Sequence, residues 1–236
     1  MKSSLTSFFT IAAVAVTACT AEAQVKQPRQ LNDFQVVSSS GGIDVFLTSG
    51  PTTSVVVEAA PQAQAHVVTE VKNGTLTIGW ERNYSWRNLL SAARKVNVYI
   101  TCPRLMGLAL SGGSDAKSES NFTAEEFHIN ASGGSDVKMA LTAKSLKVEA
   151  SGGSDVSLSG RVERQHVVVS GGSDYKAYAL PSSTTKVDAS GGSDVYVTVS
   201  GELSSSASGG SDVHYKGNAH LANSGTSGGS GVHHVQ

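Results

Sequence analysis

A short motif, Ser-Gly-Gly-Ser, recurs seven times between residue 111 and the C-terminus, and Asp follows it in six of those copies. The copies begin at Ser111, Ser132, Ser151, Ser170, Ser190, Ser208 and Ser227, at intervals of 21, 19, 19, 20, 18 and 19 residues. Self-similarity at a period of about 20 residues is typical of architectures that stack one supersecondary unit on the next. We therefore expect the same backbone turn at each copy, in a fold made of stacked coils.

Apolar and polar residues alternate on both sides of each copy. Around the third copy, Leu146, Val148 and Ala150 alternate before the glycines, and Val156 and Leu158 alternate after them. This period of two predicts a pair of half-buried strands joined by a tight turn. A Gly-Gly pair supplies the positive φ angles that such a turn needs. The glycines expected in these turns are Gly112, Gly113, Gly133, Gly134, Gly152, Gly153, Gly171, Gly172, Gly191, Gly192, Gly209 and Gly210.

One repeat has room for two strands of five or six residues and two turns, which make one coil of a β-solenoid. We predict an all-β fold, a parallel β-helix or β-solenoid with coils of about 19 residues, each strand lying about 4.8 Å from its equivalent in the next coil. Solvated turns are expected at the opposite corner, in segments 142–145, 159–164, 180–183 and 200–202. An antiparallel meander of hairpins is the alternative.

The first half of the chain carries a looser form of the same pattern. Residues 40–45, Ser-Gly-Gly-Ile-Asp-Val, are a divergent copy of the motif, and Asn73-Gly74 is a strong hairpin signal. We predict one β-solenoid domain over residues 34–236, preceded by a linker at 24–33.

The N-terminus indicates export. Residues 1–23 have the features of a signal peptide, with Lys2 before an apolar stretch at 5–18 that is too short to span a bilayer. Cleavage after Ala23 would follow the small residues of Ala-Glu-Ala. Alternatively, Val-Thr-Ala-Cys at 16–19 resembles a lipobox, so that the signal would end at Ala18 and Cys19 would carry a lipid. Both cleavage sites predict a location in the periplasm, the outer membrane or the cell surface.

The charge balance argues against nucleic acid as a partner, because the formal net charge is −1 and no basic excess marks a binding face. We expect no cofactor, and membrane contact only through the alternative lipid anchor. Cys102 follows an apolar run at 96–100 and is expected to be a buried small hydrophobe. The alternative, a catalytic thiol, would want a histidine and an electropositive setting.

These motifs together resemble a known family. The early Gly-Ile-Asp-Val-Phe-Leu, the Asn-Gly-Thr-Leu-Thr-Ile at 73–78 and the repeated Ser-Gly-Gly-Ser-Asp-Val turns resemble exported bacterial proteins with the head GIN domain, the auto-transporter adhesins. The resemblance covers about residues 34–236. It implies a right-handed β-helix related in shape to pectate lyases, no established catalytic residues and an adhesive role.

Stacked turns would place the motif's aspartates in a row, which we call the aspartate row. Like charges about 4.8 Å apart repel, so each carboxylate or its neighbouring serine is expected to accept hydrogen bonds from turn N–H groups. The alternative is Ca²⁺ between successive turns, as in RTX β-rolls. Here the third glycine of the RTX motif is absent and the period is about 19 residues instead of nine. The row comprises Asp115, Asp136, Asp155, Asp174, Asp194 and Asp212.

Both tryptophans fall in one segment that breaks the strand pattern. Aromatic rings beside arginines suit carbohydrate or anion recognition. The other interpretation is a loop or short helix that covers an open end of the solenoid. The candidate ligand-binding residues are Trp80, Arg82, Tyr84, Trp86 and Arg87.

Three functions remain open from the sequence. The first is a non-enzymatic envelope protein that binds an unknown surface partner or glycan. The second is a polysaccharide-active enzyme on a pectate-lyase-like β-helix, which would need converging acids and bases in a groove. The third is a structural module that associates with itself through its open ends, as a homo-oligomer.

Overall fold

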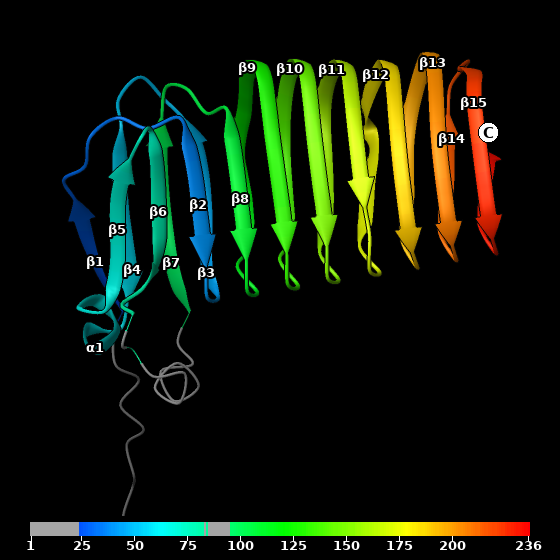
Figure 1. Cartoon of the computed structure of the whole chain (residues 1–236). Helices are drawn as coiled ribbons and strands as arrows, with labels where there is room; N and C mark the ends of the chain where they lie inside the picture. The colour runs from blue at the N-terminus through cyan, green and yellow to red at the C-terminus, as the bar shows by residue number, and fades with distance from the viewer. Residues whose placement is uncertain (1–23, 83, 85–94) are drawn as a thin grey trace, which may run out of the picture.

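The computed structural model describes residues 24–82, 84 and 95–236, which form an elongated stack of β-strands (Figure 1). The N-terminal part contains β1 (Val25–Arg29), β2 (Val36–Ser40), β3 (Ile43–Ser49), β4 (Ser54–Ala59), α1 (Pro61–Gln64), β5 (Val67–Lys72), β6 (Thr75–Trp80), β7 (Val96–Cys102) and β8 (Gly107–Ser111). The remaining strands are β9 (Ala116–Ser132), β10 (Val137–Ser151), β11 (Asp155–Val169), β12 (Asp174–Gly191), β13 (Asp194–Gly209), β14 (Asp212–Lys216), β15 (His220–Gly228) and β16 (Gly231–His234).

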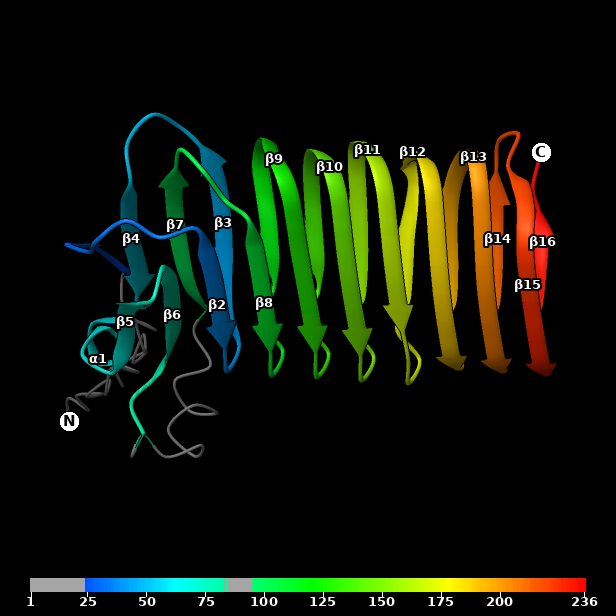
Figure 2. The same ribbon diagram turned by 45° about the horizontal axis from the view of Figure 1, so that its top comes forward.

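The strands from β8 onward wind as a β-solenoid, with each coil stacked in parallel on the one before (Figure 2). Val137 of β10 lies in register with Val156 of β11, and Val148 with Val167, so that equivalent apolar residues stack along the core. We call face one the strands that follow each glycine turn, namely β3, β14, β16 and the first parts of β9–β13. Face two holds the strands that precede the turns: β2, β8, β15 and the second parts of β9–β13. The predicted β-solenoid is confirmed.

The corner opposite the glycine turns differs from the prediction. The pairing of β10 with β11 continues through Leu141↔Gly160, Thr142↔Arg161 and Ala143↔Val162, so one strand of 15–18 residues bends from face one to face two in β10–β13. The prediction of solvated turns at 142–145 and 159–164 was wrong. It rested on polar and charged residues, and such residues also occur where side chains point outward from a bent strand. In the parallel stack, the backbone groups at this corner pair with the neighbouring coil instead of with water.

The glycine turns stack so closely that their backbones touch. A Cβ added at Gly152 would lie 3.1 Å from the backbone N of Gly133, and both residues have positive φ (70° and 67°). In the first four copies both glycines have positive φ, as predicted. In the copies at 191–192 and 209–210 only the first glycine does, while the N–H of Gly210 donates to the Gly191 carbonyl at 2.7 Å. The expectation of positive φ was therefore wrong for Gly192 and Gly210.

The fourth residue of the first six copies of the motif is a buried serine, and these serines hydrogen-bond from coil to coil. The backbone N–H of Ser135 donates to Ser154 Oγ at 3.1 Å, and that of Ser154 donates to Ser173 Oγ at 3.1 Å. Each of these serines is 0% exposed. The hydroxyl of Ser135 also donates to the Ser132 carbonyl at 2.9 Å. Serine is therefore required here because one small side chain satisfies a buried amide that no strand reaches.

Replacing Ser154 by Ala should destabilise the protein by about 1–3 kcal/mol, because the Ser135 N–H would remain buried without an acceptor. Chemical denaturation followed by circular dichroism measures the change. Ser151→Ala is the matched control, since Ser151 lies in the same turn and is exposed. Equal losses in the two variants would contradict a role for the buried hydroxyl.

The N-terminal end of the stack departs from the regular coil. β1 pairs with β4 and β4 with β7, both antiparallel, and β5 and β6 form a hairpin across Asn73 and Gly74, both at positive φ. The hairpin confirms the Asn-Gly signal. The expected linker at 24–33 instead contains β1, because Val25–Arg29 pairs residue by residue with Val55–Ala59.

A second buried polar network lies among the apolar side chains of the core. Gln165 on β11 is 3% exposed, and its Oε1 accepts a hydrogen bond from the Tyr175 hydroxyl at 2.7 Å. Its Nε2 donates to Ser182 Oγ at 3.2 Å and to Thr185 Oγ1 at 3.1 Å. Burial raises the pKa of Tyr175, which keeps the phenol protonated as the donor. The network ties β11 to the irregular middle of β12.

Candidate binding groove

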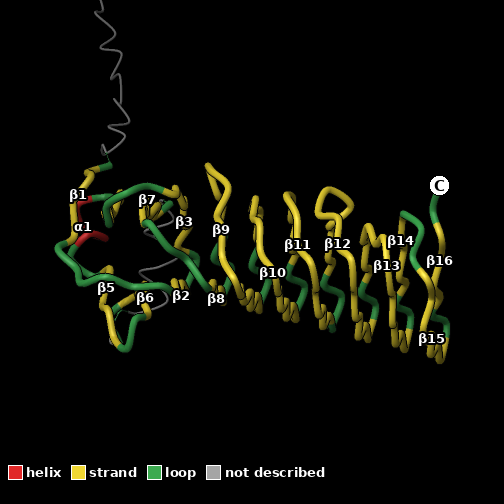
Figure 3. Tube along the Cα trace, turned by 90° about the horizontal axis from the view of Figure 1, so that it is seen from above, coloured by secondary structure: helices red, strands yellow, loops and turns green. Residues whose placement is uncertain are grey.

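Two coils of the solenoid are longer than the others, and each bulges outward on face one. Between Lys117 and Asn121, β9 carries three residues where β10 carries one, and β12 carries Ala177 and Tyr178 opposite a single residue of β11. These strands belong to the repeats of 21 and 20 residues. Seen from above, β9 and β12 have longer outlines than β10 and β11, which lie between them in the stack (Figure 3). Extra residues in a strand that must stay in register are expelled as bulges.

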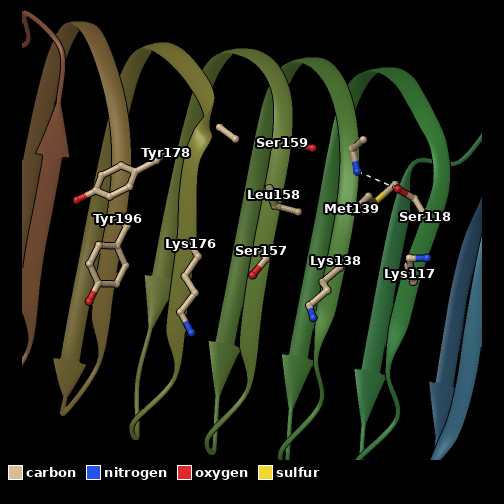
Figure 4. A pocket seen from close by; sticks show the side chains of 12 residues that line it. Lys117, Ser118, Lys138, Met139, Ser157, Leu158, Ser159, Lys176, Tyr178 and Tyr196 are labelled. Carbon is tan, nitrogen blue, oxygen red and sulfur yellow. Dashed lines mark hydrogen bonds between the residues drawn. The ribbon is translucent and has the colours of Figure 1, made fainter.

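A groove of about 670 Å³ lies between the two bulges, over β10 and β11. We call it the lysine–tyrosine groove. Its floor is low because the outward residues Ala140, Ser157 and Ser159 are short. Longer side chains stand around that floor, with Lys117 at one end and Tyr178 and Tyr196 at the other (Figure 4). The complete lining is Lys117, Ser118, Lys138, Met139, Ala140, Ser157, Leu158, Ser159, Lys176, Tyr178, Ala179 and Tyr196.

The two tyrosines form a rigid aromatic wall. Their rings meet edge to face, with centroids 5.5 Å apart, and the Lys216 ammonium lies 5.1 Å from the Tyr178 centroid. The bulge in β12 is held by Thr198, whose hydroxyl donates to the Tyr178 carbonyl at 2.9 Å. Partial burial raises the pKa of both phenols, and the negative charge of Asp194 adds to the effect at Tyr196. Both rings therefore remain neutral and can donate as well as accept hydrogen bonds.

Three lysines share one outward position in the coils of β9, β10 and β12, where β11 carries Ser157, and their environments differ. Lys117 pairs with Glu119 at 2.8 Å, and Lys176 bridges Asp155 at 2.9 Å and Asp174 at 3.0 Å. The hydrogen bond to Asp155 raises the pKa of Lys176, with Asp174 contributing. Within residues 24–82, 84 and 95–236, Lys138 makes no ion pair. Its ammonium is therefore the one best placed among the three to pair with an incoming anion.

Two aspartates of the row accept hydrogen bonds from the turn backbone, as the structural interpretation predicts. Asp136 donates its N–H to Asp115 Oδ1 at 3.0 Å, and Asp155 donates its N–H to Asp136 Oδ1 at 3.4 Å. Lys176 neutralises Asp155 and Asp174, whereas Lys117 and Lys138 form no ion pair with an aspartate of the row in the described chain. In the part of the chain that the structure describes, no group of three His, Cys, Asp or Glu is arranged to hold a metal ion.

Trp80 and Tyr84 of the tryptophan segment lie near the N-terminal end of the molecule, away from the tyrosine wall on β12 and β13. Trp80 stacks on Tyr84 at 5.0 Å between centroids, and its Nε1 donates to the Gly41 carbonyl at 2.8 Å. A Cβ on Gly41 would meet the Trp80 ring at 2.8 Å, so this ring packs directly on the first glycine turn. Arg82 is exposed. Trp86 and Arg87 lie outside the described residues, as does Cys19.

Cys102 is fully buried, as expected for a small core residue. Burial raises the pKa of its thiol to about 11. The thiol is therefore protonated at neutral pH and inert as a nucleophile.

The sequence reasoning missed the groove, although a signal for it was present. The repeat intervals of 21 and 20 residues mark the coils that bulge. Tyr178 and Tyr196 could not be assigned to one wall from the sequence, because the bulge changes which residues of β12 point outward.

Stacked parallel coils with a groove on one face place the chain among the β-solenoid proteins. It belongs to the family described as "Putative auto-transporter adhesin, head GIN domain", whose profile matches residues 33–219. This confirms the resemblance seen in the sequence. No protein with a curated description matches the chain. Family membership is consistent with a non-enzymatic surface protein.

Solved structures share this fold at low sequence identity. A putative adhesin from Bacteroides fragilis is 18% identical, with a TM-score of 0.82 over 91% of this chain and 98% of that one. A protein from Parabacteroides distasonis, described as a putative lipid binding protein, is 16% identical with a TM-score of 0.69 over 92% and 98%. A putative adhesin from Parabacteroides merdae is 14% identical, with a TM-score of 0.69 over the same shares. Among the described residues no helix is long and apolar enough to cross a membrane.

Proposed function

We propose that the protein is an exported, non-enzymatic component of the cell envelope that attaches to surface glycans through the lysine–tyrosine groove. The observation that carries the proposal is the groove itself, which two lengthened repeats build on an otherwise regular face. Its volume of about 670 Å³ falls in the range of small-ligand sites. The groove is open at the surface, so a segment of a longer chain can lie in it.

The chemistry of the lining suits a sugar. The C–H faces of a sugar ring pack on aromatic rings, and Tyr178 and Tyr196 offer such faces along with phenol groups for hydrogen bonds to hydroxyls. Ser157 and Ser159 add further donors and acceptors on the floor. A carboxylated sugar would place its charge at Lys138 through a charge-assisted hydrogen bond.

The alternative of a polysaccharide-active enzyme receives less support from this site. Glycoside hydrolases use a pair of carboxylates that flank the scissile bond. The described residues that line the groove are lysines, tyrosines, serines and apolar residues, and the nearby Asp155 and Asp174 are engaged by Lys176. We therefore propose binding as the role of the groove. Export rests on the features of residues 1–23, and processing after Ala23 or before Cys19 serves it equally.

The double variant Tyr178→Ala/Tyr196→Ala should lose glycan binding by about tenfold or more, because two ring contacts of about 0.5–1.5 kcal/mol each would vanish together with their buried area. A glycan array identifies ligands for the wild-type chain, and calorimetry compares the variants on the strongest one. Lys138→Ala should weaken carboxylated glycans more than neutral ones.

Tyr99→Ala is the matched control, since Tyr99 lies on β7, which pairs with the face-one strand β3, and its ring stacks on Phe46 at 5.1 Å outside the groove. Binding that falls equally in the control and in the double variant, or that survives the loss of both groove tyrosines, would refute the assignment of the site. Absence of any glycan ligand would refute the proposed function.

A further inference from the structure

The two ends of the solenoid are built differently. At the N-terminal end the outermost strands are β1 and β5. β1 contains Pro28, which has no N–H to offer to another strand, and β5 carries Glu70 and Lys72, an ion pair at 2.9 Å. Proline and charges are the usual means by which proteins prevent edge strands from pairing with another chain.

The other end lacks these features. β15 pairs with β13 from His220 to Gly228, with a one-residue shift after Leu221, and no other strand of the described residues pairs with its outer side (Figure 1). All nine of its residues are exposed, and its sequence, HLANSGTSG, contains no Asp, Glu, Lys, Arg or Pro. An edge strand directs alternate N–H and C=O groups outward, where they can pair with a further strand.

Apolar surface is also uncovered at this end. Leu221 stands on β15 in register with the fully buried Leu203 of β13, yet it is 38% exposed. On face one the terminal strand β16 holds its position through ring stacking, with His233 on His214 at 5.1 Å and His234 on Tyr215 at 4.9 Å. The terminal coil thus packs against β13 and β14 on its inner side, while its outer side is exposed.

We propose that this C-terminal edge is a docking surface for a second copy of the same chain. Two identical edges related by a twofold axis can pair antiparallel, β15 against β15, which makes an isologous interface that closes as a dimer. Head-to-tail stacking would instead bring β15 against β1 or β5, where Pro28 and the charges of Glu70 and Lys72 oppose it. Pairing at the end leaves both copies of the lysine–tyrosine groove uncovered, so the interface is independent of the proposed glycan site.

Sedimentation velocity of the full exported chain over a wide range of concentration tests this inference. The wild-type chain should sediment as an elongated dimer that dissociates on dilution. Asn223→Lys/Ser227→Lys should be monomeric throughout, because like charges would face each other across the edge. Both side chains are exposed and lie at positions paired with the outward Ser204 and Ser208, so the coil itself should still fold.

Two controls locate the interface. Val68→Lys places a charge on β5 at the opposite end, where Val68 is 39% exposed, and should leave the dimer intact. Thr142→Lys/Ser183→Lys adds the same two charges at exposed corner positions and should also remain dimeric. A wild-type chain that is monomeric at every concentration, a dimer that survives Asn223→Lys/Ser227→Lys, or one that Val68→Lys dissociates would overturn the proposal. Glycan binding measured on the same variants reports separately on the groove.

Discussion

Replacing Gly191 by Ala should cost about 2–4 kcal/mol of stability, whereas replacing its neighbour Gly192 by Ala should change stability by less than about 0.5 kcal/mol. Gly191 has φ +84°, a conformation that costs a residue with a Cβ about 1–2 kcal/mol. The new Cβ would also lie 2.9 Å from the backbone N of Gly171 in the coil below. A backbone atom cannot move aside as a flexible side chain does, so the two coils would have to separate.

Gly192 provides the control within the same dipeptide. Its φ is not positive, and a Cβ there would meet no atom within 4 Å. Both variants can be compared by denaturant unfolding at equilibrium. If the two substitutions destabilise the chain equally, close stacking of the turns is not what requires the first glycine.

Replacing Gln165 by Ala should be comparably harmful, with an expected loss of about 2–4 kcal/mol. The variant would leave the Tyr175 hydroxyl and the hydroxyls of Ser182 and Thr185 with fewer partners in the core, next to a cavity of side-chain size. Each buried polar group without a partner costs about 1–3 kcal/mol, although Ser182 and Thr185 can still bond to each other at 2.7 Å.

Arg164→Ala is the matched control for this network. Arg164 precedes Gln165 on the same strand, but its side chain is 62% exposed, and its ion pair with Glu163 spans 4.0 Å at the surface. Exposed pairs of this kind contribute little, so its removal should stay within about 0.5 kcal/mol. A loss at Gln165 no larger than that at Arg164 would show that the buried network contributes nothing to stability.

The period and the turn chemistry were sufficient to predict the solenoid and the parallel stacking of coils. They failed at the corner opposite the turns. There Glu163 and Arg164 both point outward in succession, and the next residue, Gln165, points inward. Because this bend breaks the alternation of inward and outward residues, a polar residue at the corner could not be assigned to the core from the sequence.

The candidate glycan site likewise separates what the local sequence indicates from what the tertiary structure decides. The sequence directed attention to the tryptophan segment, where rings and arginines are neighbours along the chain. The groove instead collects Lys117, Lys138, Tyr178 and Tyr196 from four different coils, and these meet only because the parallel register brings residues about 20 positions apart to adjacent places. Local sequence cannot reveal such a site unless the lengths of the repeats are read together with the register.

The repeated Ser-Gly-Gly-Ser-Asp motif thus specified the coil, because a turn at positive φ with a buried hydroxyl is a local requirement that residue types state directly. Which coils bulge, what surface lies between them and which end of the stack remains open depend on how each coil registers with its neighbours. Those features come from hydrogen bonding between strands that are distant in the chain, and they set the binding groove and the docking edge.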